Sequence, residues 1–138
     1  MYVGPKDQIE IITNVLSNKA ECELRLGRYH DAAKTATDAL VYLNQHKKSR
    51  IRRSKAQFAI AKQRGDKLEN NLRYIVQART DLMALHRVRV SAAASEIFKT
   101  MFPEVNEECA RIKVDIWDKR PNFDYDTFVC TYQKKCMY

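Results

Sequence analysis

Residues that interrupt regular structure are scarce in this chain, and this scarcity constrains the fold more than any other feature. Three glycines and three prolines occur among 138 residues, and residues 67–102 form a run of 36 without either. Because glycine and proline are the strongest local interrupters, their absence favours long helices over many short strands. At 1.5 Å per residue, the run is compatible with one helix of about 50 Å or with two helices separated by an unmarked break. We therefore expect an all-α fold.

Three shorter segments precede this run, and each places apolar or small residues at three- and four-residue spacing. The spacing predicts helices over 7–26, 29–43 and 48–63. We expect Pro103 to end the long helical run, and residues 104–119 to form a short amphipathic helix. The aromatic-rich segment after that helix is expected to be an extended tail, with room for one strand. These boundaries divide the chain into a helical part, 1–102, and a tail part, 103–138.

The charge balance indicates an anionic partner. The chain carries 25 lysines and arginines against 17 aspartates and glutamates, which gives a net charge of +8. Six of the basic residues lie within the nine-residue strip KKSRIRRSK at 47–55, which contains no acidic residue. Such a surplus suits an acidic peptide, a nucleic acid or an anionic membrane surface, and charge alone does not choose among them.

Cysteine and histidine usage argues against a metal site and for a reduced compartment. The four cysteines contain no CxxC pair, and His30, His46 and His86 have no metal-ligand spacing relative to them. Residues 1–12 lack the apolar run of a secretory signal, and no segment has the length of a membrane span. We expect a cytoplasmic protein with free thiols, no cofactor and no membrane partner. The absence of any catalytic motif predicts that it is not an enzyme.

The first two expected helices contain a repeat-like pattern of small residues around a glycine turn. Small residues at the contact between two helices allow their backbones to approach closely, while an aromatic residue fills the space beside the turn. The pattern consists of Ala20, Gly27, Tyr29, Ala32, Ala39 and Leu40. It resembles the tetratricopeptide repeat, which implies stacked antiparallel helical hairpins. A second, weaker unit follows if its turn is about five residues longer.

Two stretches narrow the resemblance to the tetratricopeptide domains of heat-shock co-chaperones, including the large immunophilins. They are SNKA at 17–20 and KSRIRRSKA at 48–56. That family binds the acidic C-terminal tails of chaperones through a clamp for two carboxylates. The resemblance implies that Asn18, Lys48 and Arg52 are clamp residues, with Arg53 and Lys55 as flanking positive charge. The family takes further clamp residues from an upstream repeat, so only half a clamp is expected here.

Two other functions remain open. The chain is also compatible with a scaffold subunit or homo-oligomer, because its C-terminal aromatic residues are too apolar to remain exposed. We expect these to be buried in this chain or against another: Trp117, Phe123, Tyr125, Phe128, Tyr132 and Tyr138. The remaining alternative is a nucleic-acid-binding protein that contacts phosphates through the strip at 47–55 together with Arg73, Arg79, Arg87 and Arg89.

Overall fold

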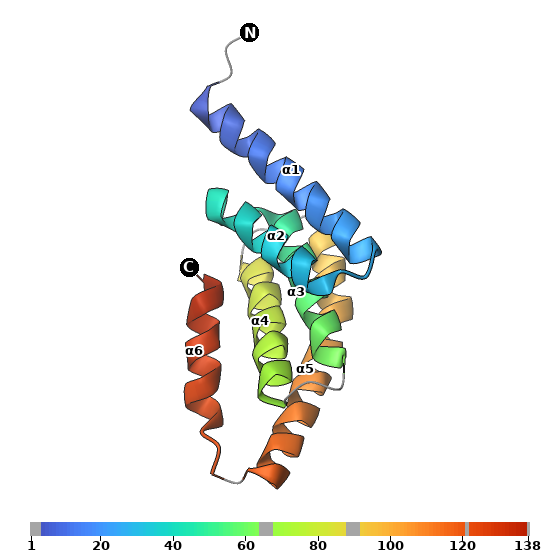
Figure 1. Ribbon diagram of the computed structural model, residues 1–138, viewed down its shortest axis with the longest axis vertical. Helices are drawn as coiled ribbons and strands as arrows, with labels where there is room; N and C mark the ends of the chain where they lie inside the picture. The colour runs from blue at the N-terminus through green and yellow to red at the C-terminus, as the bar shows by residue number, and fades with distance from the viewer. Residues whose placement is uncertain (1–3, 64–67, 88–91, 121, 138) are drawn as a thin grey trace.

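The described part of the chain is built from helices joined by short connections, which confirms the all-α prediction (Figure 1). The computed structural model describes residues 4–63, 68–87, 92–120 and 122–137, and no β-strand occurs within these ranges. The helices are α1 (Pro5–Arg25), α2 (Tyr29–Tyr42), α3 (Lys47–Lys62), α4 (Leu68–Arg87), α5 (Ala92–Lys119) and α6 (Tyr125–Met137). The first three lie within two residues of their predicted bounds.

Helices α1 and α2 form a tight hairpin at the predicted glycine turn. Gly27 has a φ of 76°, a left-handed conformation that glycine adopts without steric cost. Its amide donates to the Leu24 carbonyl at 3.1 Å, and the Arg28 amide donates to the Glu23 carbonyl at 2.9 Å. These two bonds close the end of α1 as a Schellman motif. The alanines of the predicted pattern, Ala20, Ala32 and Ala39, are fully buried, and so is Ala36.

Consecutive helices pack against one another through α5, so the chain forms a stack of antiparallel neighbours. Contacts also join α1 to α3 and α3 to α5. The main apolar core lies away from α1, between α3, α4 and α5. Its largest fully buried side chains include Leu72, Ile75 and Leu82 of α4, and α5 contributes Val105. Helix α4 therefore occupies the centre of the apolar core.

The run without glycine or proline contains a break, and the expected helix end at Pro103 is wrong. The run divides into α4 and the start of α5, and α5 then continues through Pro103 to Lys119, across the suggested boundary at residues 102 and 103. A proline inside a helix removes one backbone hydrogen bond and costs about 3 kcal/mol. Apolar residues on both sides of Pro103 pack on the same core, which offsets this cost. Met101 is partly buried there, and Val105 is fully buried.

The prediction of an extended segment after residue 120 is also wrong, because α6 occupies residues 125–137. Asp124 begins this helix: its carboxylate accepts hydrogen bonds from the Thr127 amide at 3.1 Å and the Thr127 hydroxyl at 2.7 Å. These bonds lower the pKa of Asp124. Helix α6 turns back along the molecule and packs against α4 (Figure 1).

The expected burial of the C-terminal aromatic residues is confirmed for most of those that the structure describes. Phe123, Tyr125, Phe128 and Tyr132 are partly buried and pack against the main core. The Tyr125 hydroxyl lies 3.3 Å from the Cys109 sulfur, and burial together with this contact raises the pKa of Tyr125. Trp117 is 62% exposed and so is not buried within this chain, and its burial against another chain stays a prediction. Tyr138 lies outside the described residues.

Candidate functional site

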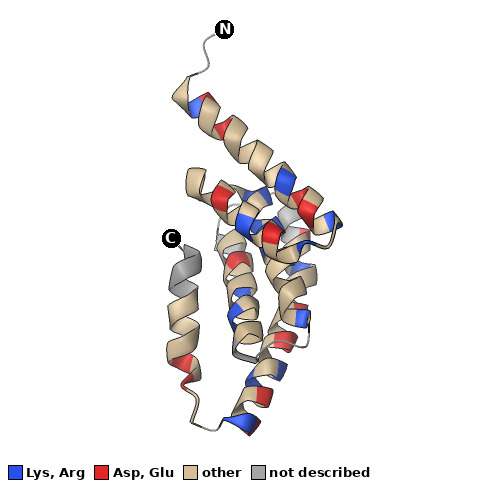
Figure 2. Cartoon of the chain, in the orientation of Figure 1, with Lys and Arg blue, Asp and Glu red and all other residues tan. Residues whose placement is uncertain are grey.

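The candidate site lies where α1 and α3 run side by side, with charged residues of both signs spread over the neighbouring helices (Figure 2). Asn18 is exposed on α1, while Lys48 and Lys55 are exposed on α3. Arg52 lies between the two lysines and is partly buried against α1. These four residues are referred to below as the α1–α3 surface.

Arg52 joins the two helices directly. Its Nη1 donates to the Ser17 hydroxyl at 2.7 Å, and its Nε lies 3.2 Å from Oε2 of Glu21. The other carboxylate oxygen of Glu21 accepts from Nε of Arg25 at 3.1 Å. Ser17 directly precedes Asn18, so Arg52 contacts α1 one residue away from the predicted clamp asparagine, whose side chain is exposed and points about 100° away on the helix. The guanidinium of Arg52 therefore already binds one carboxylate, supplied by this chain.

His46 precedes α3 and experiences the charges of both predicted clamp cations. Its Nδ1 accepts from the Ser49 amide at 3.3 Å and so caps the helix, while Nε2 lies 3.2 Å from Oδ1 of Asn14. With Nδ1 accepting, the ring is the neutral tautomer that carries its proton on Nε2. Burial lowers the pKa of His46, and the positive charges of Arg52 and Lys48 lower it further.

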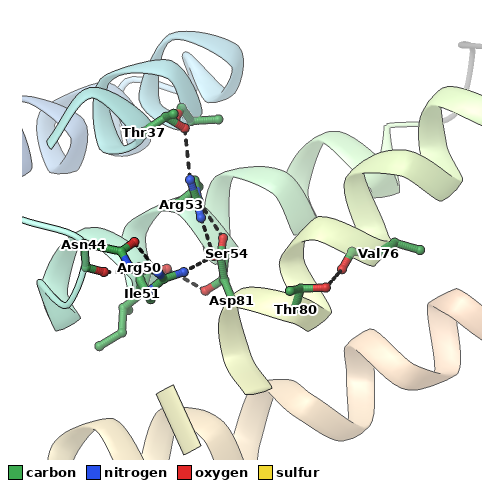
Figure 3. A network of polar contacts seen from close by, with 10 residues as sticks. Thr37, Asn44, Arg50, Ile51, Arg53, Ser54, Val76, Thr80 and Asp81 are labelled. Atoms are coloured by element: carbon green, nitrogen blue, oxygen red, sulfur yellow. Dashed lines mark hydrogen bonds and ion pairs between the residues drawn. The ribbon is translucent and has the colours of Figure 1, made fainter. Parts of the chain in front are cut away.

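Arg53 is not the exposed flanking charge that the sequence suggested. Its side chain is 8% exposed and points toward α4, where the carboxylate of Asp81 is fully buried. Nε of Arg53 donates to Oδ2 of Asp81 at 2.8 Å, and Nη2 donates to Oδ1 at 2.6 Å (Figure 3). A buried carboxylate needs such paired donors, because its removal from water is costly. This bidentate pair makes Arg53 a structural residue.

Arg50 binds the same carboxylate from one turn earlier in α3. Its Nη1 donates to Oδ1 of Asp81 at 3.0 Å, and its Nη2 donates to the side-chain oxygen of Asn44 at 2.9 Å (Figure 3). Arg53 extends the network to α2, because its Nη1 reaches the Thr37 hydroxyl at 3.4 Å. The strip at 47–55 is therefore divided. Two of its arginines stabilise the interior, while its exposed cations point elsewhere.

The comparisons with known proteins found no match. No protein-family model, no curated protein and no solved structure resembles the chain closely enough to be matched. Among the described residues, no helix combines the length and apolar character needed to cross a bilayer. The same residues contain no cluster of three or more histidine, cysteine or acidic side chains suited to a metal ion.

Sequence reasoning missed three residues that define this region. Asp81 lies in the middle of α4, and nothing nearby in the sequence marks it as the partner of two arginines 28 and 31 residues earlier. Glu21 and His46 were missed for the same reason, since their roles depend on how α1 packs on α3. One local signal was available for His46, because it directly precedes the helix and a polar residue there often caps it.

Removal of the Asp81 charge is expected to destabilise the fold strongly. In Asp81→Asn, two guanidinium groups stay buried without their shared carboxylate, and such a loss costs about 3–5 kcal/mol. Urea unfolding at pH 7 measures this free energy. Asp118→Asn is the matched control, because Asp118 is exposed on α5 and its change should stay within about 0.5 kcal/mol. Equal effects of the two substitutions would contradict the structural role of Asp81.

The lowered pKa of His46 predicts a loss of stability in mild acid. As the pH falls through 6.5, the unfolded chain takes up a proton at this histidine before the folded chain does. The free energy of unfolding should therefore decrease as the pH falls from neutral to the folded-state pKa of His46. Below that pKa, His46 causes no further decrease. His46→Asn keeps a capping side chain and removes the titration. Chemical unfolding from pH 8 to 5 should show a smaller decrease for this variant, and equal slopes would refute the assignment.

Proposed function

We propose that the chain is a tetratricopeptide-like interaction module that binds an acidic peptide at the α1–α3 surface. The hairpin turn, the buried alanines and the stacking of antiparallel helices support the fold type. The ligand is an extended segment that ends in a free carboxylate and carries a further acidic side chain, as in the C-terminal tails of heat-shock chaperones. Such a module is an adaptor and performs no chemistry of its own.

One observation carries this proposal: the guanidinium of Arg52 binds a carboxylate on the α1–α3 surface, that of Glu21, which the peptide carboxylate would replace or share. The contact with Glu21 supports carboxylate binding at Arg52. Lys48 lies four residues before Arg52 and Lys55 lies three residues after it, so all three share one side of α3. Charge-assisted hydrogen bonds of this kind contribute about 1.5–3 kcal/mol each when the groups are desolvated. Asn18 adds an amide donor from α1.

The structure favours a peptide over a nucleic acid. Phosphate binding by the strip at 47–55 requires its arginines at the surface, and two of them are instead buried against Asp81. Arg73 and Arg79 are only partly exposed on α4. Arg89 lies outside the described residues, as does the side chain of Arg87.

A peptide ending in several aspartates and a free carboxylate should bind the full chain, and Lys48→Ala should weaken binding about tenfold through the loss of one charge-assisted contact. Lys55→Ala should have a smaller effect, because the resemblance makes Lys55 a flanking charge. Both residues are exposed, so folding should be unaffected. Lys119→Ala removes an equal charge at the far end of α5 and serves as the control. Isothermal titration calorimetry gives the dissociation constants.

Two further measurements make this experiment decisive. Amidation of the peptide terminus should remove most of the affinity, since the terminal carboxylate is the proposed anchor. A carboxylate bound between Lys48 and Arg52 should also raise the pKa of His46, which NMR of its imidazole reports. Binding that survives amidation, or that falls equally in the Lys119 variant, would refute a specific site on the α1–α3 surface.

The scaffold alternative is favoured by a separate observation on the first helical hairpin. The first turns of α1 extend beyond α2 (Figure 1), and apolar side chains are exposed there and at the end of α2. They are Ile9, Ile11, Ile12, Val15, Val41, Tyr42 and Leu43. Exposed apolar residues that cluster in this way are typical of protein interfaces.

If this surface is an interface between copies of the chain, the purified protein should self-associate, and the double variant Ile11→Ser with Val15→Ser should reduce this association. The two side chains are 54% and 61% exposed and lie four residues apart on α1. Val114→Ser on α5, where the side chain is 58% exposed, is the control. Sedimentation equilibrium over a range of concentrations measures the association. A monomer at every concentration would exclude a homo-oligomeric scaffold.

A further inference from the structure

A second polar site lies away from the α1–α3 surface, in a pocket of about 340 Å³ that α2, α3 and α4 enclose together. This volume is at the lower end of the range for small-molecule sites, which is roughly 300–1,000 Å³. The lining includes Lys34 of α2, Arg53 and Gln57 of α3, and Arg73 and Tyr74 of α4. These residues come from three helices that pack on one another, so the pocket is an open hollow in the folded chain.

The lining of the pocket is basic. Lys34, Arg53 and Arg73 line it together with His30, and none of its nine lining residues is acidic. The charge of Arg53 is balanced by the buried Asp81, which leaves Lys34 and Arg73 as the cations for a ligand. Arg73 is held in place by aromatic rings, since its guanidinium carbon lies 5.2 Å from the centre of the Tyr74 ring and 5.5 Å from that of Tyr132. Tyr74 is in turn packed edge-on against His30, with ring centres 5.6 Å apart. Such fixed cations favour an anionic ligand at low entropic cost.

Two buried polar atoms of the lining residues have no hydrogen-bond partner. Gln57 is only 5% exposed, and its Oε1 is buried without a donor, while Nε of Arg73 is buried without an acceptor. An unpartnered buried polar atom costs about 1–3 kcal/mol. Both atoms have almost no accessible surface, so a ligand that offers an acidic oxygen to Arg73 and a hydroxyl to Gln57 satisfies them only after a small shift of the two side chains.

We propose that this pocket binds a small hydroxylated phosphate monoester. The planar guanidinium of Arg73 and the ammonium of Lys34 suit a phosphate dianion, for which guanidinium has matching geometry. The Gln57 oxygen accepts a hydrogen bond from a hydroxyl on the organic part of the ligand. This site is independent of the proposed peptide binding, because it uses other residues on another side of α3.

Titration of the full chain with three probes tests the proposal: glycerol 3-phosphate, inorganic phosphate and acetate, all at physiological salt. Glycerol 3-phosphate should bind most tightly, inorganic phosphate less tightly, and acetate weakest. Amide shifts in NMR spectra should concentrate on the residues that line the pocket. Absence of binding at millimolar glycerol 3-phosphate overturns the proposal. Equal affinity for inorganic phosphate and the ester overturns the assignment of a hydroxylated ester.

Two variants and one control separate this site from a general attraction to positive charge. Lys34→Ala removes an exposed cation and should weaken the binding of both phosphates about tenfold. Gln57→Leu should abolish the preference for the ester while leaving the protein at least as stable, because it removes an unpaired buried oxygen. Lys55→Ala removes the same charge from the α1–α3 surface and should change nothing. An equal loss in the Lys34 and Lys55 variants overturns the site.

Discussion

The fold depends on one fully buried carboxylate that two arginines of the preceding helix share. Asp81 receives three hydrogen bonds from Arg50 and Arg53, and these arginines extend the network to Thr37 and Asn44 (Figure 3). The interaction therefore ties α3 to α4, to α2 and to the connection that precedes α3. Burial of ions is costly, so such a cluster is stable only when its hydrogen bonds are satisfied. It fixes how α3 is rotated, and that rotation decides which cations remain at the surface.

This rotation explains why a strip of similar basic residues has two different uses. Adjacent helical residues differ in direction by about 100°, so Arg52 and Arg53 point to different neighbours. Arg53 enters the interior, whereas Arg52 lies against α1 beside Glu21. Local sequence placed Asn18, Lys48 and Arg52 on the α1 and α3 segments. Local sequence gave no indication of which cations would pair with Asp81, because the ion pair links residues about 30 positions apart.

The sequence predicted the helices best where glycine and small residues set the pattern, and worst after Pro103. Gly27 and the buried alanines define the first hairpin through local geometry. The helix continues through Pro103, because apolar packing on both sides of it offsets the cost of a proline inside a helix. The sequence does contain local signals for helix α6. Asp124 is a capping residue, and the apolar positions that follow it, at 125, 128, 129 and 132, have helical spacing.

The packing of α6 on α4 has a consequence for biosynthesis. The two helices are separated in the chain by α5, so the side of α4 that α6 covers stays open while the ribosome is still translating the intervening segment. Phe128 and Tyr132 complete the shielding only after they have left the exit tunnel. During that interval the nascent polypeptide exposes an apolar surface on α4, the kind of surface that general chaperones recognise on emerging chains.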